Sequence, residues 1–282
     1  MISVAIGIHD PQGSYASHAG ALLASLFART TRPVCAHVLH DATLTTGNGD
    51  KLEAIAQRFG HEVRFHQVVL PEAVRPLGGH VTEGALFRLL LPDILQVDKV
   101  IYFDCDIVVG LDIQELWQVD LEGKPVAAAL DSGFAFFPEH ILQRIRATGI
   151  RSSSYFNSGV LVMDLDRLRK EYRLFSQAVE FIQRFPDSVF HDQDALNWLF
   201  ENRFRVLEPK FNRIVSRTAS NEFRLPAIWH FAGVKPWQVY TSAQDMLYWK
   251  ALQLTPWGGE VLDRLAAAMA QTIRQMNAML NR

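Results

Sequence analysis

The first seventy residues alternate between short, β-rich apolar runs and helical patterns, and this alternation restricts the fold more than any other feature. The expected elements are strands at residues 2–8, 34–39 and 63–69 and helices near residues 19–26 and at 50–59. Strand, helix, strand, helix, strand is the order of a parallel sheet covered by helices. The sequence therefore predicts an α/β fold.

The rest of the chain continues without an internal repeat, a low-complexity tract or a linker. The further expectations are a helix at 83–95 interrupted by Pro92, strands at 99–109, 126–130 and 160–163, and helices at 173–184 and 192–200. A last amphipathic helix is expected at 259–282, because its apolar residues recur at helical spacing. We therefore predict one domain over residues 1–240 and a helical extension over residues 241–282.

Composition excludes several classes of protein. A formal charge of −2 over 282 residues gives no basic surface for nucleic acid. The two cysteines, Cys35 and Cys105, form no CxxC pair and are too few for a disulfide scaffold. The N-terminus lacks a signal-peptide pattern, and no apolar run approaches the ~20 residues of a membrane helix. A cytoplasmic protein is expected, with peripheral contact at the inner face of the membrane left open.

Two aspartates interrupt the apolar run KVIYFDCDIVV at residues 99–109. In an extended segment, Asp104 and Asp106 point to the same face while Cys105 points away. Two carboxylates at the end of a buried strand repel each other and lose hydration, a cost that a divalent cation can offset. In open α/β sheets the ligand crevice lies beyond the carboxyl ends of the strands. An isolated DxD is more often a capping residue beside a solvated one, so the partners decide between the two interpretations.

Other polar residues have both a structural and a functional interpretation. Arg88 is either a surface side chain or a buried guanidinium that binds an acidic partner. Asn157 and Ser158 open a strand, where an amide suits sugar hydroxyls but a plain turn is equally compatible. One aspartate of His191–Asp194 would serve as a helix cap. His230, between two aromatic residues, would by itself be a core or edge histidine.

Four segments resemble family 8 glycosyltransferases, which include lipopolysaccharide galactosyl- and glucosyltransferases and glycogenin. In chain order they are RLLLPDILQVDKVIYFDCDIVV, YFNSGVLVMDL, HDQDALNWLF and HFAGVKPW. The resemblance covers roughly residues 1–240. It implies a GT-A fold, a single Rossmann-like nucleotide-binding domain with a mixed, mostly parallel sheet. It also implies a UDP-sugar donor, Mn²⁺ with Mg²⁺ as an alternative, and retention of anomeric configuration.

The same resemblance assigns residues to the site. The implied metal ligands are Asp104, Asp106 and His230. The implied donor-binding residues are His9, Asp10, Tyr15, Arg88, Asp104, Cys105, Asn157, Ser158, Gly233 and Lys235. The implied catalytic residues are Gln193, Asp192 and Asp131. Two departures stand out: His9 replaces an aspartate that contacts uracil, and Lys235 lies one residue closer to Gly233 than in the usual pattern.

The sequence therefore predicts a metal-dependent, retaining hexosyltransferase that moves glucose or galactose from a UDP-sugar to an acceptor hydroxyl. The expected acceptor is a glycan or glycolipid such as lipopolysaccharide, with no nucleic acid partner and a homodimer left open. A sugar nucleotidyltransferase is an alternative, although residues 9–15 lack the basic phosphate loop that it would need. A non-catalytic nucleotide-sugar-binding protein is a second alternative, and the joint presence of Asp104, Asp106, His230, Arg88 and Gln193 argues against it.

Overall fold

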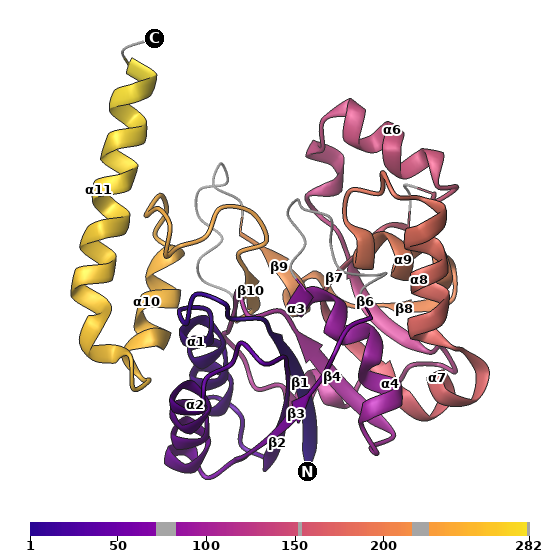
Figure 1. Ribbon diagram of the computed structural model, residues 1–282, viewed down its shortest axis with the longest axis horizontal. Helices are drawn as coiled ribbons and strands as arrows, with labels where there is room; N and C mark the ends of the chain where they lie inside the picture. The colour runs from indigo at the N-terminus through magenta and orange to yellow at the C-terminus, as the bar shows by residue number, and fades with distance from the viewer. Residues whose placement is uncertain (72–82, 152–153, 216–225, 281–282) are drawn as a thin grey trace.

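The computed structural model describes residues 1–71, 83–151, 154–215 and 226–280 (Figure 1). The first strands and helices agree with the alternation in the sequence. They are β1 (Ile2–Ile8), α1 (Ala16–Phe27), β2 (Val34–His40), α2 (Thr46–Phe59) and β3 (Glu62–Gln67). The next long strands are β4 (Lys99–Phe103), β6 (Val126–Leu130) and β7 (Phe156–Asp164), followed by the short β8 (Phe204–Val206).

These strands form one seven-stranded sheet in the order β3-β2-β1-β4-β7-β6-β8. β1, β2, β3 and β4 pair in parallel, and so do β6 and β8. β7 runs antiparallel to both of its neighbours, β4 and β6. The central sheet is therefore mixed and mostly parallel, as predicted.

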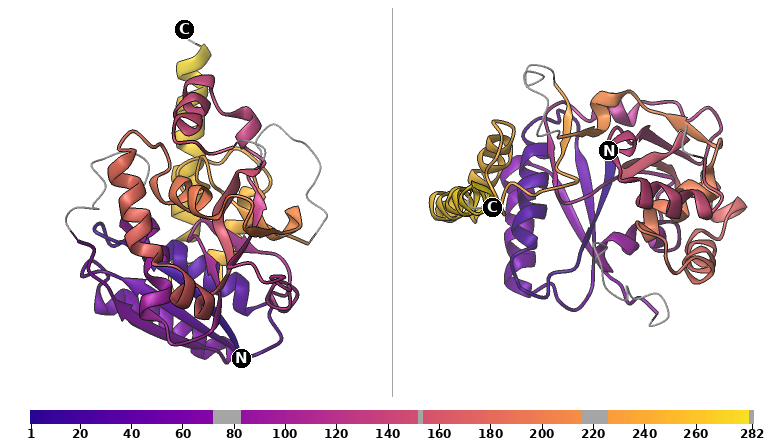
Figure 2. Two further views of the ribbon diagram at one scale, coloured as in Figure 1. Left: turned by 90° about the vertical axis from the view of Figure 1, so that its right-hand side faces the viewer. Right: turned by 90° about the horizontal axis from the view of Figure 1, so that it is seen from above.

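Helices cover both faces of this sheet, as Figures 1 and 2 show. Alternate residues of β1 divide between two apolar clusters, because successive side chains of a strand point to opposite faces. Val4 and Ile6 join the cluster under α1 and α2, whereas Ala5 joins the cluster on the other face. The helices of that second face are α4 (Leu91–Ile94), α7 (Leu165–Glu171), α8 (Leu174–Arg184) and α9 (His191–Phe200).

The expected single strand at 99–109 is wrong, because the chain turns at Asp104–Asp106. The first part is β4, and the second part is β5 (Ile107–Val109), which belongs to a separate three-stranded sheet. There β5 pairs antiparallel with β10 (Ile228–His230), which also pairs with β9 (Arg213–Ile214). The chain leaves the central sheet because β5 finds its hydrogen-bonding partners in β10 rather than in β1 or β7.

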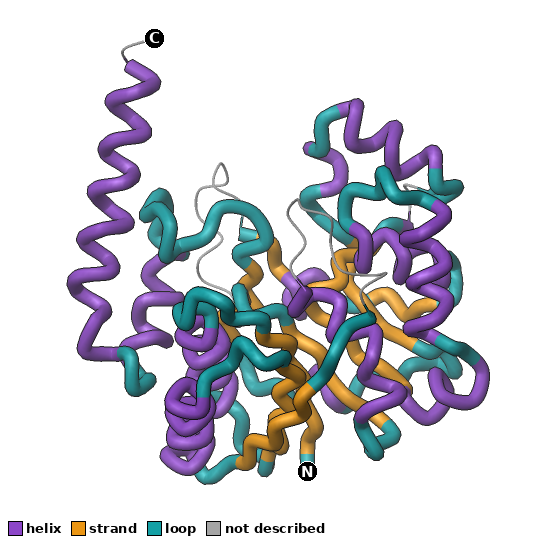
Figure 3. Tube along the Cα trace, viewed as in Figure 1, coloured by secondary structure: helices purple, strands orange, loops and turns teal. Residues whose placement is uncertain are grey.

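The expected helix at 83–95 is helical over residues 83–94, but its interruption is a 3₁₀ turn (Phe87–Leu90) between α3 (Glu83–Leu86) and α4, not Pro92. Figure 3 colours the chain by helix, strand and loop. Pro92 lies in the first turn of α4. Proline is well tolerated there, since the N–H it lacks would have no helical partner. Sequence patterning missed α5 (Gln114–Trp117), α6 (Glu139–Ala147) and α7, which are short.

The C-terminal part adds α10 (Asp245–Gln253) and α11 (Val261–Leu280). α10 packs against α1, and α11 extends beyond the body of the molecule in Figure 1. The tryptophans of this part serve packing, because Trp229, Trp249 and Trp257 are buried and Trp237 stacks on His18. The boundary at residue 240 stays a prediction. Among the described residues, no helix has the length and apolar character needed to cross a membrane.

Candidate metal and donor site

Strand register explains why residues far apart in sequence meet at one edge of the sheet. β7 is antiparallel to β4, and Phe103 pairs with Val160, so the start of β7 lies beside the end of β4. The N–H of Asp104 donates to the carbonyl of Gly159 at 2.8 Å. His230 pairs with Ile107 across β10 and β5, which places it next to Asp106.

A compact group, here called the metal group, consists of Asp104, Asp106 and His230. One ligand atom of each residue lies within 4.8 Å of the others. Nε2 of His230 lies 3.2 Å from Oδ1 of Asp106 and 3.9 Å from Oδ2 of Asp104. Oδ1 of Asp106 is buried and has no hydrogen-bond partner. Two carboxylates and one imidazole suit Mn²⁺, so these residues fit the predicted cation. The structure brings the three residues together through a turn rather than an extended strand, and their role as metal ligands stays a prediction.

Gly159 makes room for this group. A Cβ atom at this position would lie 2.2 Å from Cε1 and 2.8 Å from Nδ1 of His230, and 2.9 Å from Oδ2 of Asp104. No side chain fits at such distances, so glycine is required for the imidazole to approach the two carboxylates.

Arg88 is a buried cation that contacts two carboxylates. Its Nη2 donates to Asp104 Oδ1 at 2.6 Å, and its Nε lies 3.2 Å from Asp192 Oδ2. Its Nη1 donates to the carbonyl and the hydroxyl of Ser158 at 2.6 and 2.9 Å. The structure thus favours the buried guanidinium over a surface side chain. Burial raises the pKa of Asp192 to about 6, although Arg88 lowers it.

Three buried residues lie together where β6 ends, β7 begins and α9 begins: Asp131, Asn157 and Gln193. Asp131 Oδ2 accepts from Nδ2 of Asn157 at 3.1 Å and from Nε2 of Gln193 at 3.3 Å. Oε1 of Gln193 accepts the N–H of Ser158 at 2.9 Å. Asn157 and Ser158 belong to β7 itself and not to a turn before it. The predicted catalytic residues therefore share one hydrogen-bonded network.

Lys235 reaches the metal group from the loop after β10. Its Nζ contacts Oδ2 of Asp106 and donates to the carbonyl of Phe231. Burial raises the pKa of Asp106, but the charge of Lys235 is the largest opposing effect, and the pKa lies below its usual range. At Gly233 a Cβ atom would meet nothing within 4 Å, so the backbone there is open to a ligand.

Cys105 is buried, and its thiol donates to the carbonyl of Gly7 at 3.3 Å. Its side chain thus points away from the carboxylates, as predicted. Asp10 stabilises the start of α1, because its carboxylate accepts the N–H groups of Tyr15 and Ala16 at 2.6 and 3.2 Å. Tyr15 is half-buried, and burial followed by the nearby Cys105 raises its pKa.

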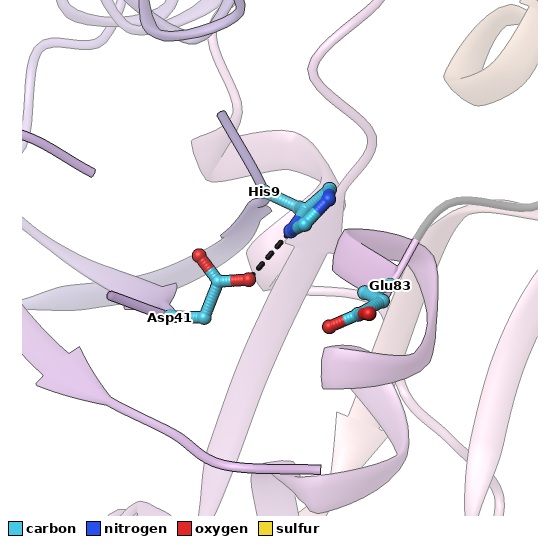
Figure 4. A group of neighbouring side chains, drawn as sticks. All are labelled: His9, Asp41 and Glu83. Atoms are coloured by element: carbon cyan, nitrogen blue, oxygen red, sulfur yellow. Dashed lines mark hydrogen bonds and ion pairs between the residues drawn. The ribbon is translucent and has the colours of Figure 1, made fainter. Parts of the chain in front are cut away.

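His9 lies in a second group of possible metal ligands, with Asp41 and Glu83 (Figure 4). Nδ1 of His9 is 2.5 Å from Oδ2 of Asp41, and Figure 4 shows Glu83 on the neighbouring helix. Oδ1 of Asp41 accepts the N–H of Thr43 at 2.9 Å and its hydroxyl at 2.5 Å. This group is half-buried, and its histidine already has a carboxylate partner.

Sequence reasoning missed three polar residues of the site. Oδ1 of Asn212 lies 2.9 Å from Nδ1 of His230. Tyr155 donates to Asp194 at 2.5 Å and accepts from Gln193 at 3.1 Å. The sequence predicts that one aspartate of His191–Asp194 caps a helix, and Asp194 accepts the N–H of Phe190 at 3.1 Å at the start of α9. No local pattern marks Asn212, since its partners come from other strands.

The sequence comparisons agree with this geometry. The model of glycosyl transferase family 8 matches residues 10–241. General stress protein A of Bacillus subtilis (strain 168) is 31% identical over 256 residues, which cover 81% of this chain and 86% of that protein. Glycosyltransferase GlyB of Streptococcus pneumoniae is 26% identical over 198 residues, and the match spans 65% of this chain but only 45% of GlyB.

Solved structures share the fold. The galactosyltransferase LgtC, crystallised with donor and acceptor sugar analogs, has a TM-score of 0.75 and 26% identity, covering 92% of this chain and 99% of LgtC. The bifunctional glycosyltransferase WbbM has the same TM-score of 0.75 at 21% identity, covering 93% of this chain and 51% of WbbM. The chain therefore belongs to glycosyl transferase family 8 and is a glycosyltransferase with a GT-A fold.

Proposed function

We propose that the protein transfers glucose or galactose from a UDP-sugar to an acceptor hydroxyl, in a metal-dependent reaction that retains anomeric configuration. The observation that carries this proposal is the meeting of Asp104, Asp106 and His230 beside the buried Arg88. LgtC, which has been crystallised with donor and acceptor sugar analogs, supports a nucleotide-sugar donor and a sugar acceptor. A glycan or glycolipid such as lipopolysaccharide is the proposed acceptor.

Asp104, Asp106 and His230 would hold the divalent cation, for which we propose Mn²⁺. When bound, the cation would act as a Lewis acid for the departing diphosphate. Lys235 contacts Asp106, and its compact charge suits a phosphate oxygen. The open backbone at Gly233 would let the diphosphate approach.

The sugar would be held by the buried network beyond β7. Asp192 and Asp131 would accept hydrogen bonds from sugar hydroxyls, and Arg88 contacts both Asp192 and Asp104. Gln193 is neutral, so it adds no repulsion with the diphosphate while its amide dipole can face developing positive charge. LgtC has an active-site glutamine, since its glutamine-to-glutamate active-site mutant has been crystallised. A poor nucleophile here favours attack of the acceptor on the face that UDP leaves.

His9, Asp10 and Tyr15 would lie near the nucleoside. Tyr15 is the proposed stacking partner of the base, since it is only half-buried and lies near the carboxylate pair. Because His9 is hydrogen-bonded to Asp41, the His9–Asp41 pair would select uracil in place of an aspartate at position 9.

The donor and the metal are tested together by thermal shift with UDP-, GDP- and CMP-sugars, each with Mn²⁺ or with EDTA. UDP-glucose or UDP-galactose should stabilise the protein only when the metal is present. Better stabilisation by a GDP- or CMP-sugar would overturn the donor assignment, and full transfer activity in excess chelator would overturn metal dependence.

Stereochemistry is tested by NMR of the anomeric proton of the product. An α-linked product from an α-linked UDP-sugar is expected, and a β-linkage would refute retention. Gln193→Ala should lower turnover roughly 10- to 10³-fold, as when one charge-stabilising group is removed, with UDP affinity little changed. Wild-type turnover in this variant would remove Gln193 from the mechanism.

A further inference from the structure

A continuous chain of buried side chains joins the metal group to Gln193. Nδ1 of His230 lies 2.9 Å from Oδ1 of Asn212, and Nδ2 of Asn212 donates to Oδ1 of Asn157 at 2.9 Å. Asn157 and Gln193 both donate to Oδ2 of Asp131, at 3.1 and 3.3 Å. All five side chains are buried. No part of the proposed mechanism involves Asn212.

Backbone donors fix the orientation of the amides. The oxygen and nitrogen of an amide side chain have nearly the same shape, so only hydrogen bonds distinguish them. The N–H of Gly159 can only donate, and it lies 3.0 Å from Asn157. The atom that faces it must therefore be Oδ1. In the same way the N–H of Ser158 fixes Oε1 of Gln193 at 2.9 Å.

The orientation of Asn157 then determines the tautomer of His230. Oδ1 of Asn157 must receive an N–H, so Nδ2 of Asn212 faces Asn157 and Oδ1 of Asn212 faces the imidazole. An amide oxygen accepts only, so Nδ1 of a neutral His230 carries the proton. Nε2 is then unprotonated and points at Asp106.

This tautomer explains the unpaired oxygen in the metal group. Nε2 of His230 lies 3.2 Å from Oδ1 of Asp106, yet that oxygen has no hydrogen-bond partner. Lone pairs of a nitrogen and of carboxylate oxygens converge with no hydrogen between them. These lone pairs repel one another when nothing lies between them, and a cation that accepts all of the lone pairs would remove this repulsion.

We propose that Asn212 is a positioning residue that holds His230 as the Nδ1–H tautomer, so that Nε2 is available to a divalent cation. The orientation originates in the N–H of Gly159 and passes through Asn157 and Asn212. This inference rests on the proposed function in one respect, that the cation binds at Asp104, Asp106 and His230. Because the same strand fixes Gln193 through Ser158, two consecutive residues of β7 orient both the metal side and the sugar side.

The first experiment measures the tautomer in the wild-type protein without metal. Histidine ¹⁵N–¹H correlation spectra at pH 8 distinguish Nδ1–H from Nε2–H, and a His230→Gln variant assigns the resonances. The Nδ1–H form is expected. A predominant Nε2–H form would overturn the proposed relay, the chain of hydrogen bonds from Gly159 through Asn157 and Asn212 to His230. This result does not depend on the proposed function, because it holds whatever the protein binds.

The second experiment replaces Asn212 and measures Mn²⁺ affinity in the presence of UDP by electron paramagnetic resonance. Asn212→Leu removes both side-chain bonds, and metal affinity should fall about 10- to 100-fold, as when other second-layer partners of metal ligands are replaced. Asn212→Asp keeps an oxygen opposite Nδ1 and should retain the Nδ1–H form. Unchanged metal affinity in Asn212→Leu would overturn the positioning role.

Asn197→Leu is the matched control. Asn197 is also a buried amide, and it bonds the backbone of Phe156 at 2.8 and 2.9 Å and the backbone carbonyl of Gln193 at 2.9 Å, at the end of the chain of buried side chains opposite His230. It should lower the melting temperature but leave the His230 resonances unchanged. A shift of those resonances equal to that in Asn212→Leu would show that general loosening, and not the relay, sets the tautomer. Absence of metal binding in the wild type would refute the proposed function and leave the tautomer to decide the relay.

Discussion

Among the described residues, two groups combine one histidine with two carboxylates, and they differ in burial and in the hydrogen bonds of the histidine. In each group the ligand atoms lie within 4.8 Å of one another. The side chains of His230 and Asp106 are 3% and 10% exposed, whereas those of His9 and Asp41 are 23% and 16% exposed. Nδ1 of His230 faces Asn212 while its Nε2 faces the two carboxylates, whereas Nδ1 of His9 is bonded directly to Asp41.

The difference shows that proximity of ligand types does not by itself define a metal site. In the buried group, desolvation makes unpaired carboxylate oxygens costly, and no side chain hydrogen-bonds Oδ1 of Asp106. In the half-exposed group, Thr43 and His9 already occupy both oxygens of Asp41. We therefore expect a cation to prefer the first group.

The largest effect is expected from Gly159→Ala. The added methyl would lie 2.2 Å from Cε1 of His230, so the imidazole must leave the carboxylates. Mn²⁺-supported transfer should fall by at least about 10²-fold, the order seen when one charge-stabilising group is lost. Gly47→Ala, where a Cβ meets nothing within 4 Å, is the control and should keep wild-type activity. Equal activity of the two variants would contradict the packing argument.

The second prediction compares one carboxylate of each group. Asp106→Asn should abolish metal-supported UDP binding with the fold intact, since the buried ligand is lost. Asp41→Asn should leave Mn²⁺ affinity within about threefold, because a half-exposed ion pair is worth only ~0–1 kcal/mol. Mn²⁺ titration followed by electron paramagnetic resonance measures both. Similar losses in the two variants would mean that the groups act as one metal site.

The third prediction concerns pH. Burial raises the pKa of Asp192 to about 6, against the opposing effect of Arg88. If its carboxylate holds a sugar hydroxyl, kcat/KM should fall about tenfold per pH unit below pH 6, following the loss of the ionised form. Asp192→Asn should have lower activity and no such acid limb. An unchanged inflection in that variant would assign it to another group.

The smallest effect is a difference in the sign of pH-dependent stability. The pKa of Asp41 is lowered, because hydrogen bonds from Thr43 and His9 outweigh burial. Its contribution is present above its unfolded pKa of about 3.9 and is lost as the pH falls through the folded value. The pKa of Asp192 is raised, so its contribution is present below the unfolded pKa and is lost as the pH rises through about 6.

Urea unfolding measures this difference. Asp41→Asn should cost up to about 1 kcal/mol at pH 7 and little near pH 3. Asp192→Asn should instead flatten the loss of stability between pH 4 and 6. The same sign in both variants would contradict the opposite pKa shifts of Asp41 and Asp192.

Several features could be predicted from the sequence because they depend on local pattern. The alternation of apolar runs and helical patterns determines the parallel β1–β3 region, and the apolar run before Asp104 determines a buried strand that ends in carboxylates. Four ordered segments determine the family, and with it the candidate ligands. The expected elements differ at residues 83–95, where a 3₁₀ turn divides the helical run, and at 99–109, where β5 pairs with the distant β10.

The arrangement of the site was decided only by the tertiary structure. The antiparallel direction of β7 brings Gly159 to Asp104, and no local pattern specifies the direction of a strand. Only the smaller sheet brings Asn212 next to His230, and no sequence pattern indicates that contact. Hydrogen bonds between residues 18 and 55 positions apart orient this asparagine. Such bonds depend on strand register, and register is a property of the whole sheet rather than of any one segment.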